Sequence, residues 1–509
     1  MFSDPTLDRR HLLSLLLGGA ALPLLAHGAL ADAPQTSPLP PVRGGTATQP
    51  TARPVPQALS ADALVAAAQL GGVVGYVVAD ARTGMVLEVA NAAQPLPPAS
   101  VAKALTSLYA LDALGPGYRF ATRLVATGPV SGGKVQGDLI LAGSGDPTLA
   151  TDDLADMAKA LKAQGVTGVA GRFLVWGGSL PPIAEIDRNQ PDHVGYNPAV
   201  AGLNLNFNRV YFEWRKTGSD YSVSMDARSD RFRPAVSMAT MRVVNRDAPL
   251  YTYAGANGRD DWTVARPALG NSGSRWLPVR HPDIYAGQVF QAMAAAYGIA
   301  LPAPQASRLA PPPGALVSHQ SVDLATILKD MLKYSTNVTA EVVGLTATRA
   351  RGVAAGSLAA SASAMNHWLA QKLGLRSARF VDHSGLGGDT RITPADLVAA
   401  LSSPVGKGAL RGLLRQIPLV DAKGREVTDQ PVNISAKTGT LNFVSGLAGF
   451  ATTASGTDLV FAILCADAAR RDRVPMAERE QPEGGQAWTR RARRLQQALI
   501  GRWAGVYGA

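Results

Sequence analysis

Five blocks of apolar residues along the chain have the length and the alternation of β-strands, two of them early and three of them late. They lie at residues 73–78, 85–89, 433–436, 444–452 and 458–465. Residues 60–70, before the first block, and residues 486–503, after the last one, carry apolar side chains at helical spacing. The pattern predicts an α+β fold in which helices flank one antiparallel five-stranded sheet.

Two further helical stretches frame short polar motifs. Pro95–Pro98 interrupts the chain just before Ser100, and apolar residues then recur at helical spacing, so Ser100 is predicted at the N-terminus of a helix. A second helical stretch begins at Val322, breaks at Ser335-Thr336-Asn337 and resumes to about Arg349. This triplet is therefore predicted in a corner between two helices.

The stretch between these motifs has a different character, with short strands and many turns. One strand ends in Gly143-Ser144-Gly145-Asp146-Pro147, and a helix is expected to follow at residues 152–164. A Pro-rich segment at residues 302–313 marks the return of the chain. We therefore expect an insertion at residues 119–317 inside a domain made of residues 58–118 and 318–509.

The first 31 residues have the features of an export signal. Arg9-Arg10 precede an apolar run at residues 12–25, and the small-residue site Ala29-Leu30-Ala31 predicts cleavage at its end. The run is too short to cross a bilayer comfortably. The arginine pair fits a twin-arginine signal; the alternative is an ordinary secretory signal with two incidental arginines. Residues 32–57, rich in Pro, Ala and Thr, predict a flexible tether, and the folded protein is expected in the periplasm.

The net charge and the amino-acid composition limit the classes of partner that the protein is expected to bind. Removal of the signal takes away two basic and two acidic residues, so the net charge stays at +11. Together with export, this favours peptidoglycan or anionic lipid over nucleic acid, although solubility alone also explains such a charge. The arginines of the last helix indicate at most peripheral membrane contact. The single cysteine, Cys465, excludes an intrachain disulfide, and the seven histidines lack ligand spacing, so no metal or other cofactor is expected.

Ser100 and Lys103 are three residues apart, which is about one helical turn, so their side chains project from the same face. A lysine there can accept the proton of the serine hydroxyl, provided that it is neutral. Burial and a nearby cation favour the neutral form, and Lys437 is the expected neighbour. Alone the motif is weak, because Ser-x-x-Lys occurs by chance about once in a chain of this length.

Two later motifs complete a candidate site. Ser335 is predicted to relay a proton to the leaving amine, and Asn337 to bind the substrate's backbone amide. Each motif also has a purely structural interpretation when it is considered alone. Ser335-Thr336-Asn337 is then a helix cap, and Lys437-Thr438-Gly439 is a β-turn.

Lys437-Thr438-Gly439-Thr440 is predicted to form a strand edge. Gly439 leaves room there for the backbone of a substrate, and the hydroxyls of Thr438 and Thr440 together with Lys437 make a pocket for a carboxylate. The backbone N–H groups of Ser100 and Thr440 are the expected oxyanion hole. The set predicts an acyl-transfer enzyme.

In this order the three motifs resemble those with which penicillin-binding proteins and serine β-lactamases open amides through an acyl-enzyme. With an insertion between the first two motifs, the chain is similar to the class C low-molecular-mass penicillin-binding proteins, the D-alanyl-D-alanine carboxypeptidase/endopeptidase (DacB-like) family. The resemblance covers nearly the whole chain after the signal and includes Gly143-Ser144-Gly145-Asp146-Pro147-Thr148-Leu149, Leu203-Asn204-Leu205-Asn206-Phe207-Asn208, Asp382-His383-Ser384-Gly385-Leu386 and Gly446-Leu447-Ala448-Gly449-Phe450.

The resemblance implies a transpeptidase/β-lactamase-like domain with two small inserted domains and functional residues at Ser100, Lys103, Ser335, Asn337, Lys437 and Thr438. It also implies peptidoglycan stem peptides as substrates and β-lactam antibiotics as inhibitors. Two positions depart from the family pattern: His383, where glycine is usual, and Thr336, where Asp or Asn is commoner. Neither departure removes a catalytic group, so they bear on substrate preference rather than on activity.

Three functions follow. The favoured one is a serine DD-peptidase that hydrolyses D-Ala-D-Ala termini, D-amino-acid cross-links, or both. A β-lactamase or D-amino-acid esterase on the same scaffold is the second, and a non-catalytic wall-binding protein is the third; the third is disfavoured because every reactive group is present. The sequence is compatible with a monomer or a homodimer and does not separate carboxypeptidase from endopeptidase activity.

Overall fold

The computed structural model describes residues 59–420, 425–428 and 430–508. The predicted export signal and the tether at residues 32–57 lie outside these ranges. From Ser60 onward the chain forms one compact unit, and the following paragraphs concern that unit alone. No helix in the described ranges combines the length and the apolar character that crossing a membrane requires.

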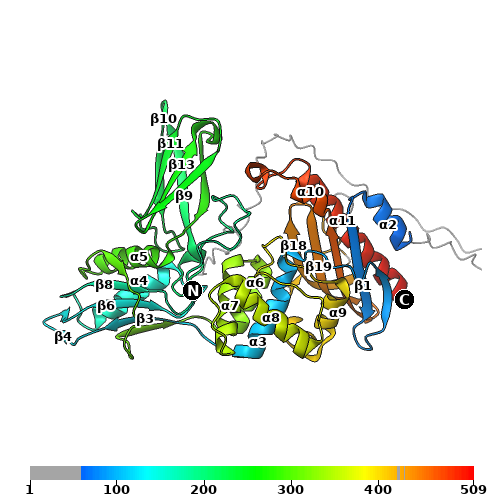
Figure 1. The fold of residues 1–509 in the computed structure, drawn as a ribbon, viewed down its shortest axis with the longest axis horizontal. Helices are drawn as coiled ribbons and strands as arrows, with labels where there is room; N and C mark the ends of the chain where they lie inside the picture. Colours follow the sequence, from blue (N-terminus) through cyan, green and yellow to red (C-terminus); the bar gives the residue numbers. More distant parts are fainter. Residues whose placement is uncertain (1–58, 421–424, 429, 509) are drawn as a thin grey trace, which may run out of the picture. The chain divides into compact units, whose positions relative to one another are not determined.

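One antiparallel sheet lies at the centre of the domain that carries the motifs (Figure 1). Its strand order is β17-β18-β19-β20-β1-β2. The strands are β1 Val73–Asp80, β2 Val86–Ala90, β17 Arg415–Gln416, β18 Val432–Leu441, β19 Val444–Thr453 and β20 Asp458–Ala466. All five predicted strands are present, and the sheet contains a sixth strand, β17. It was not predicted because its two residues leave no periodic signal in the sequence.

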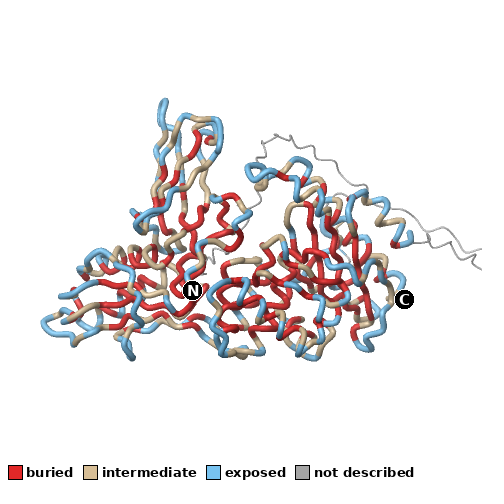
Figure 2. Tube along the Cα trace, in the orientation of Figure 1, coloured by how far each residue is buried: buried red, intermediate tan, exposed pale blue. Residues whose placement is uncertain are grey.

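Helices cover both faces of this sheet. On one face, α2 (Ala61–Ala68) and α11 (Gly485–Tyr507) pack through Trp488 and Trp503, which are fully buried against the strands. The other face is covered by α3 Ala102–Leu114, α6 Leu324–Tyr334, α7 Asn337–Ala350, α8 Leu358–Leu373 and α9 Pro394–Ser402. As Figure 2 shows, the central strands are buried along most of their length, which explains why β19 and β20 are almost continuously apolar.

The insertion is built around a second sheet with strand order β15-β8-β6-β3-β16. These strands are β3 Ala121–Ala126, β6 Leu139–Gly143, β8 Phe173–Trp176, β15 Pro304–Ala306 and β16 Val317–Gln320, and α4 Thr151–Ala163 and α5 Pro282–Ala296 pack on them. Two three-stranded sheets, β10-β9-β14 and β11-β13-β12, are formed by β9 Arg209–Thr217, β10 Asp220–Asp226, β11 Ala239–Val244, β12 Tyr251–Ala256, β13 Arg259–Ala265 and β14 Ser272–Pro278. The division of this segment into two domains stays a prediction.

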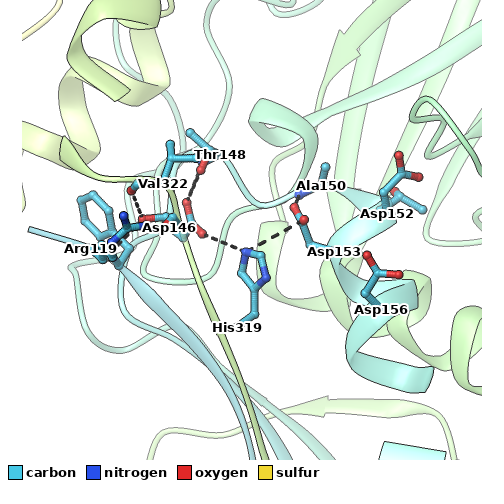
Figure 3. A network of polar contacts seen from close by, with 12 residues as sticks. Arg119, Asp146, Thr148, Ala150, Asp152, Asp153, Asp156, His319 and Val322 are labelled. Carbon is cyan, nitrogen blue, oxygen red and sulfur yellow. Dashed lines mark hydrogen bonds and ion pairs between the residues drawn. The ribbon is translucent and has the colours of Figure 1, made fainter. Parts of the chain in front are cut away.

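The Gly143–Leu149 motif lies at the base of the insertion, where β6 ends and α4 begins. Asp146 is buried, and one of its carboxylate oxygens accepts hydrogen bonds from the backbone N–H and the hydroxyl of Thr148, at 2.8 and 2.7 Å. The other oxygen faces His319 of β16, whose Nε2 lies 3.9 Å from it and 4.0 Å from a carboxylate oxygen of Asp153 (Figure 3). The motif thus contacts both the outgoing strand β3, through hydrogen bonds between Ser144 and Ala121, and the returning strand β16, through His319.

Candidate active site

Ser100 lies in a single 3-10 turn, Ala99–Val101, that leads directly into α3, close to the predicted helix N-terminus. The turn packs against β18. An ideal Cβ on Gly439 would lie 2.4 Å from the carbonyl oxygen of Pro98 and 3.0 Å from the backbone nitrogen of Ser100. Only a residue without a side chain allows this approach, so Gly439 brings the strand against the serine as well as leaving room along its edge.

The Lys103 amine lies inside the site and is completely buried. Its Nζ is 2.9 Å from Ser100 Oγ, 2.8 Å from Asn337 Oδ1 and 2.8 Å from the carbonyl oxygen of Ser384. The predicted serine–lysine pair is therefore within hydrogen-bond distance. The first motif is also joined directly to the second.

Burial lowers the pKa of Lys103 to about 7, and the nearby carboxylates of Glu341 and Asp382 oppose that shift. Lys437 is also almost completely buried, and burial, the charge of Lys103 and the charge of Arg415 hold its pKa well below the ordinary value. The sequence predicted that burial and a nearby cation, Lys437, would both favour the neutral form of Lys103. Desolvation is the cause of the shift at Lys103, whereas the repulsion between the two lysines lowers the pKa of Lys437.

Ser335 stands between α6 and α7 with a left-handed backbone (φ 61°), so the predicted helix–helix corner is confirmed. The amine of Lys437 donates to its hydroxyl at 3.0 Å and to the carbonyl oxygen of Thr438 at 2.7 Å. Asn337, at the first position of α7, uses its amide nitrogen to donate to the carbonyl oxygen of Tyr196 at 2.9 Å. The second motif thus links the third motif to the first and contacts a segment of the insertion.

The third motif occupies the second half of β18. The strand predicted at residues 433–436 and the strand edge predicted at residues 437–440 form one continuous strand, since β18 runs to Leu441 with Gly439 opposite Gly446 of β19. On its other side β17 pairs only with Ser435 and Ala436, so among the described residues no strand pairs with the outer edge of β18 from Lys437 onward. Thr438 is half-buried at this edge, and Thr440 is exposed and accepts a hydrogen bond from Arg493 at 3.3 Å. An extended peptide can add to such an edge as a further strand.

Comparison with known proteins decides the family. A model of the D-Ala-D-Ala carboxypeptidase 3 (S13) family matches residues 57–483. The chain belongs to this family. The resemblance inferred from the motifs is confirmed, and the peptidase is favoured over the β-lactamase or esterase and over the silent wall-binding protein.

Among the relatives of this S13 protein, a carboxypeptidase from Mycobacterium tuberculosis is 29% identical over 88% of this chain and 89% of its own length. A D-alanyl-D-alanine carboxypeptidase from Actinomadura sp. is 27% identical over 77% of this chain and 78% of its own. The crystal structure of penicillin-binding protein 4 (DacB) from Haemophilus influenzae is 22% identical, covers 87% of this chain and 99% of its own, and has a TM-score of 0.69. A second structure of that protein, with 20% identity, the same coverage and a TM-score of 0.67, is a complex with a novel β-lactam. The likeness to both structures shows a shared fold.

Three residues of this S13 protein surround Lys103 and were not predicted as site residues. Glu341 and Asp382 are buried carboxylates, and Ser384 contributes its backbone carbonyl. Glu341 lies four residues after Asn337 and is the only carboxylate of α7, and a lone carboxylate on the face of Asn337 is the signal that could have revealed it.

His383, one of the two departures from the family pattern, is buried and stacks against Tyr109 with 10° between the ring planes. An ideal Cβ on Gly344 would lie 2.1 Å from its ring, so the glycine of α7 makes the space that the imidazole occupies. Burial lowers the pKa of His383 to about 3, so it is neutral. Within the described ranges, no group of three or more His, Cys, Asp or Glu side chains is arranged to hold a metal ion.

Proposed function

We propose that this S13 protein is an exported serine DD-peptidase that hydrolyses D-Ala-D-Ala termini, D-amino-acid cross-links of peptidoglycan, or both, through an acyl-enzyme on Ser100. The observation that carries the proposal is the buried Lys103 amine, which lies within hydrogen-bond distance of both Ser100 Oγ and Asn337 Oδ1. The match to the S13 family supports the same reaction class.

In the acylation step, Lys103 takes the proton of the Ser100 hydroxyl while Oγ forms a bond to the scissile carbonyl carbon. The negative charge on the carbonyl oxygen is stabilised by the backbone N–H groups of Ser100 and Thr440, each worth about two to three orders of magnitude in rate. The bond to the leaving amine then breaks as that nitrogen takes the proton of the Ser335 hydroxyl, which the Lys437 ammonium replaces. The Lys437–Ser335 hydrogen bond at 3.0 Å supports this relay. Water finally hydrolyses the ester and restores Ser100.

The substrate lies along the outer edge of β18 in this proposal. Gly439 leaves the edge open, Asn337 binds the substrate's backbone amide, and Thr438, Thr440 and Lys437 bind the carboxylate next to the scissile bond. Its partners are peptidoglycan stem peptides, and β-lactam antibiotics are inhibitors that acylate Ser100. The β-lactam complex of the Haemophilus influenzae relative supports the proposed inhibition by β-lactams.

The place of action proposed for the enzyme is the periplasm, reached by the twin-arginine route, with cleavage after Ala31, a tether at residues 32–57 and two small domains in the insertion. The same proposal includes no binding of nucleic acid and at most peripheral contact with the membrane. The enzyme is either a monomer or a homodimer. Size-exclusion chromatography with light scattering measures the oligomeric state. Fractionation of cells with a defective twin-arginine translocase tests the route, and undiminished export there would refute it.

Mass spectrometry after incubation with penicillin tests the acyl-enzyme. We expect one covalent adduct whose peptide map places it on Ser100, and no adduct on a Ser100→Ala variant. Ser131→Ala, at an exposed serine of β4 (Val130–Ser131), is the matched control and keeps the adduct. A folded wild-type protein that stays unlabelled would contradict the proposal.

Digestion of purified muropeptides separates the two activities. Release of D-Ala from monomeric pentapeptides indicates carboxypeptidase activity, and conversion of cross-linked dimers to monomers indicates endopeptidase activity. Loss of both products in Ser100→Ala is expected. Hydrolysis that persists in that variant would assign the reaction to another group.

A further inference from the structure

The hydrogen bonds around Lys103 determine where its lone pair points. An ammonium has three N–H groups, and three oxygens surround Nζ at 2.8–2.9 Å. After the amine loses a proton, it keeps two N–H groups and gains a lone pair. The Ser384 carbonyl oxygen only accepts hydrogen bonds, and Asn337 Oδ1 also accepts, because the amide nitrogen of Asn337 is used toward Tyr196. Only the Ser100 hydroxyl can donate, so the lone pair must face Ser100.

This orientation depends on the position of the Ser384 carbonyl, and Glu341 and Asp382 hold the backbone before and after it. One carboxylate oxygen of Glu341 accepts from the backbone N–H of Ser384 at 2.8 Å, and the other accepts from that of His383 at 3.0 Å. Asp382 holds the next turn, accepting from the backbone N–H groups of Gly385 at 2.7 Å and Gly387 at 2.5 Å. Both carboxylates are buried, so solvent does not compete for these hydrogen bonds.

The same two carboxylates balance the charge of the buried amine. Glu341 faces Lys103 of α3 and Asp382 of the loop after α8, and His383 beside them is neutral. Two further charged groups lie nearby: Lys437 of β18, whose own pKa is lowered by the charge of Lys103, and Asp187 of the insertion, whose charge raises the pKa of Asp382. Burial raises the pKa of both carboxyls, and the charge of Asp382 raises that of Glu341 further. The two carboxylates in turn raise the pKa of Lys103 against the effect of burial.

We propose that Glu341 is a positioning residue for the base: it holds the Ser384 carbonyl against the Lys103 amine, which directs the amine's lone pair at Ser100, and with Asp382 it supplies the negative charge that allows this amine to carry a proton in a buried site. The inference rests on the proposed function of Lys103 as the base. It assigns no contact with substrate to Glu341.

Two substitutions separate position from charge. Glu341→Asp keeps the carboxylate but is shorter by one methylene and cannot reach both N–H groups, so the limiting acylation rate should fall at least tenfold with the acid limb of the pH–rate profile unmoved. Glu341→Gln removes the charge and presents an amide N–H to one of the two donors. Its limiting rate should fall by a similar factor, and its acid limb should move by at least half a pH unit to lower pH, because the protonated amine is then less stabilised.

The rates are measured as second-order acylation constants with penicillin from pH 5 to 9, normalised to folded protein by circular dichroism. Thr346→Val, a buried position of the same helix whose hydroxyl donates only to the carbonyl of Val342, is the control and should match the wild type. A loss of folded protein alone would lower the acylation constant by the same factor at every pH and would leave the inflection of the pH–rate profile in place. Folded Glu341 variants with the wild-type rate and inflection would overturn the proposal, and if Glu341→Gln does not fold, Glu341→Asp decides. A wild type that is not acylated would instead refute the proposed function.

Discussion

Replacing Gly439 with alanine tests the closest approach in the site. The added Cβ would lie 2.4 Å from the carbonyl oxygen of Pro98, whereas ordinary contact begins near 3.4 Å, so strand and turn must separate by about 1 Å. Such a displacement moves Ser100 relative to the edge of β18. A misplacement of that size costs about 10²-fold in rate, and overpacking of this kind costs about 1–3 kcal/mol in the free energy of unfolding.

The assay combines penicillin acylation kinetics with urea unfolding on a series of glycine variants. Gly446→Ala places its Cβ 3.0–3.1 Å from Val101, Leu464 and Pro98 and should lose less on both measures. Gly501→Ala, in α11 with no atom within 4 Å of the new Cβ, should keep the wild-type rate and gain slightly in stability. If Gly439 served only to make room for substrate, Gly439→Ala would unfold at the wild-type urea concentration, and that result would refute the packing argument.

Four other outcomes are expected. Because the pKa of Lys103 is about 7 and its neutral form is required, the acylation constant should rise about ninetyfold from pH 5 to pH 8, and a flat stopped-flow profile would contradict this. Since Lys437 has a depressed pKa, a peptide with a free terminal carboxylate should bind to Ser100→Ala with proton uptake, seen by calorimetry in buffers of different ionisation enthalpy; its amidated analogue should not. Trp488→Ala should cost about 3–5 kcal/mol in urea unfolding, since the side chain is fully buried, and a loss below 1 kcal/mol would show that α11 does not anchor the sheet. Burial raises the pKa of Cys465 to about 12, so iodoacetamide at pH 8 should label it only in denaturant, and labelling of the native protein would place the thiol at the surface.

The sheet could be predicted wherever burial imposes an apolar pattern. The strands that became β1, β19 and β20 have both faces covered by helices, so their sequences are apolar over nearly their whole length. The second half of β18 lacks such a pattern, because Lys437-Thr438-Gly439-Thr440 is polar and flexible. It was predicted as a strand edge from the motif alone, and its extended form is maintained by the ladder with β19. Strand pairing there overrides local preference, which a single sequence does not display.

The candidate site likewise contains groups that could be predicted from the sequence and groups that could not. Residues that meet through their side chains, such as Ser100, Lys103 and Asn337, could be predicted from their spacing, because the proposed chemistry requires particular atoms at particular intervals. The carbonyl groups of Ser384 and Tyr196 were not found, since every residue carries a carbonyl and its use depends only on the fold. The same limit applies to Glu341, whose partners are two backbone N–H groups.

The two buried lysines are chemically alike but have different surroundings. Lys103 has the carboxylates of Glu341 and Asp382 nearby, so it titrates near neutral pH and can both accept and return a proton. Lys437 has the cations Lys103 and Arg415 nearby, and together with burial they hold its pKa well below the ordinary value. In the proposed function a substrate carboxylate supplies an anion beside Lys437, and this anion stabilises an ammonium that holds the substrate and donates toward Ser335. The opposite neighbours of the two amines thus separate the base from the carboxylate-binding group without any difference between the side chains themselves.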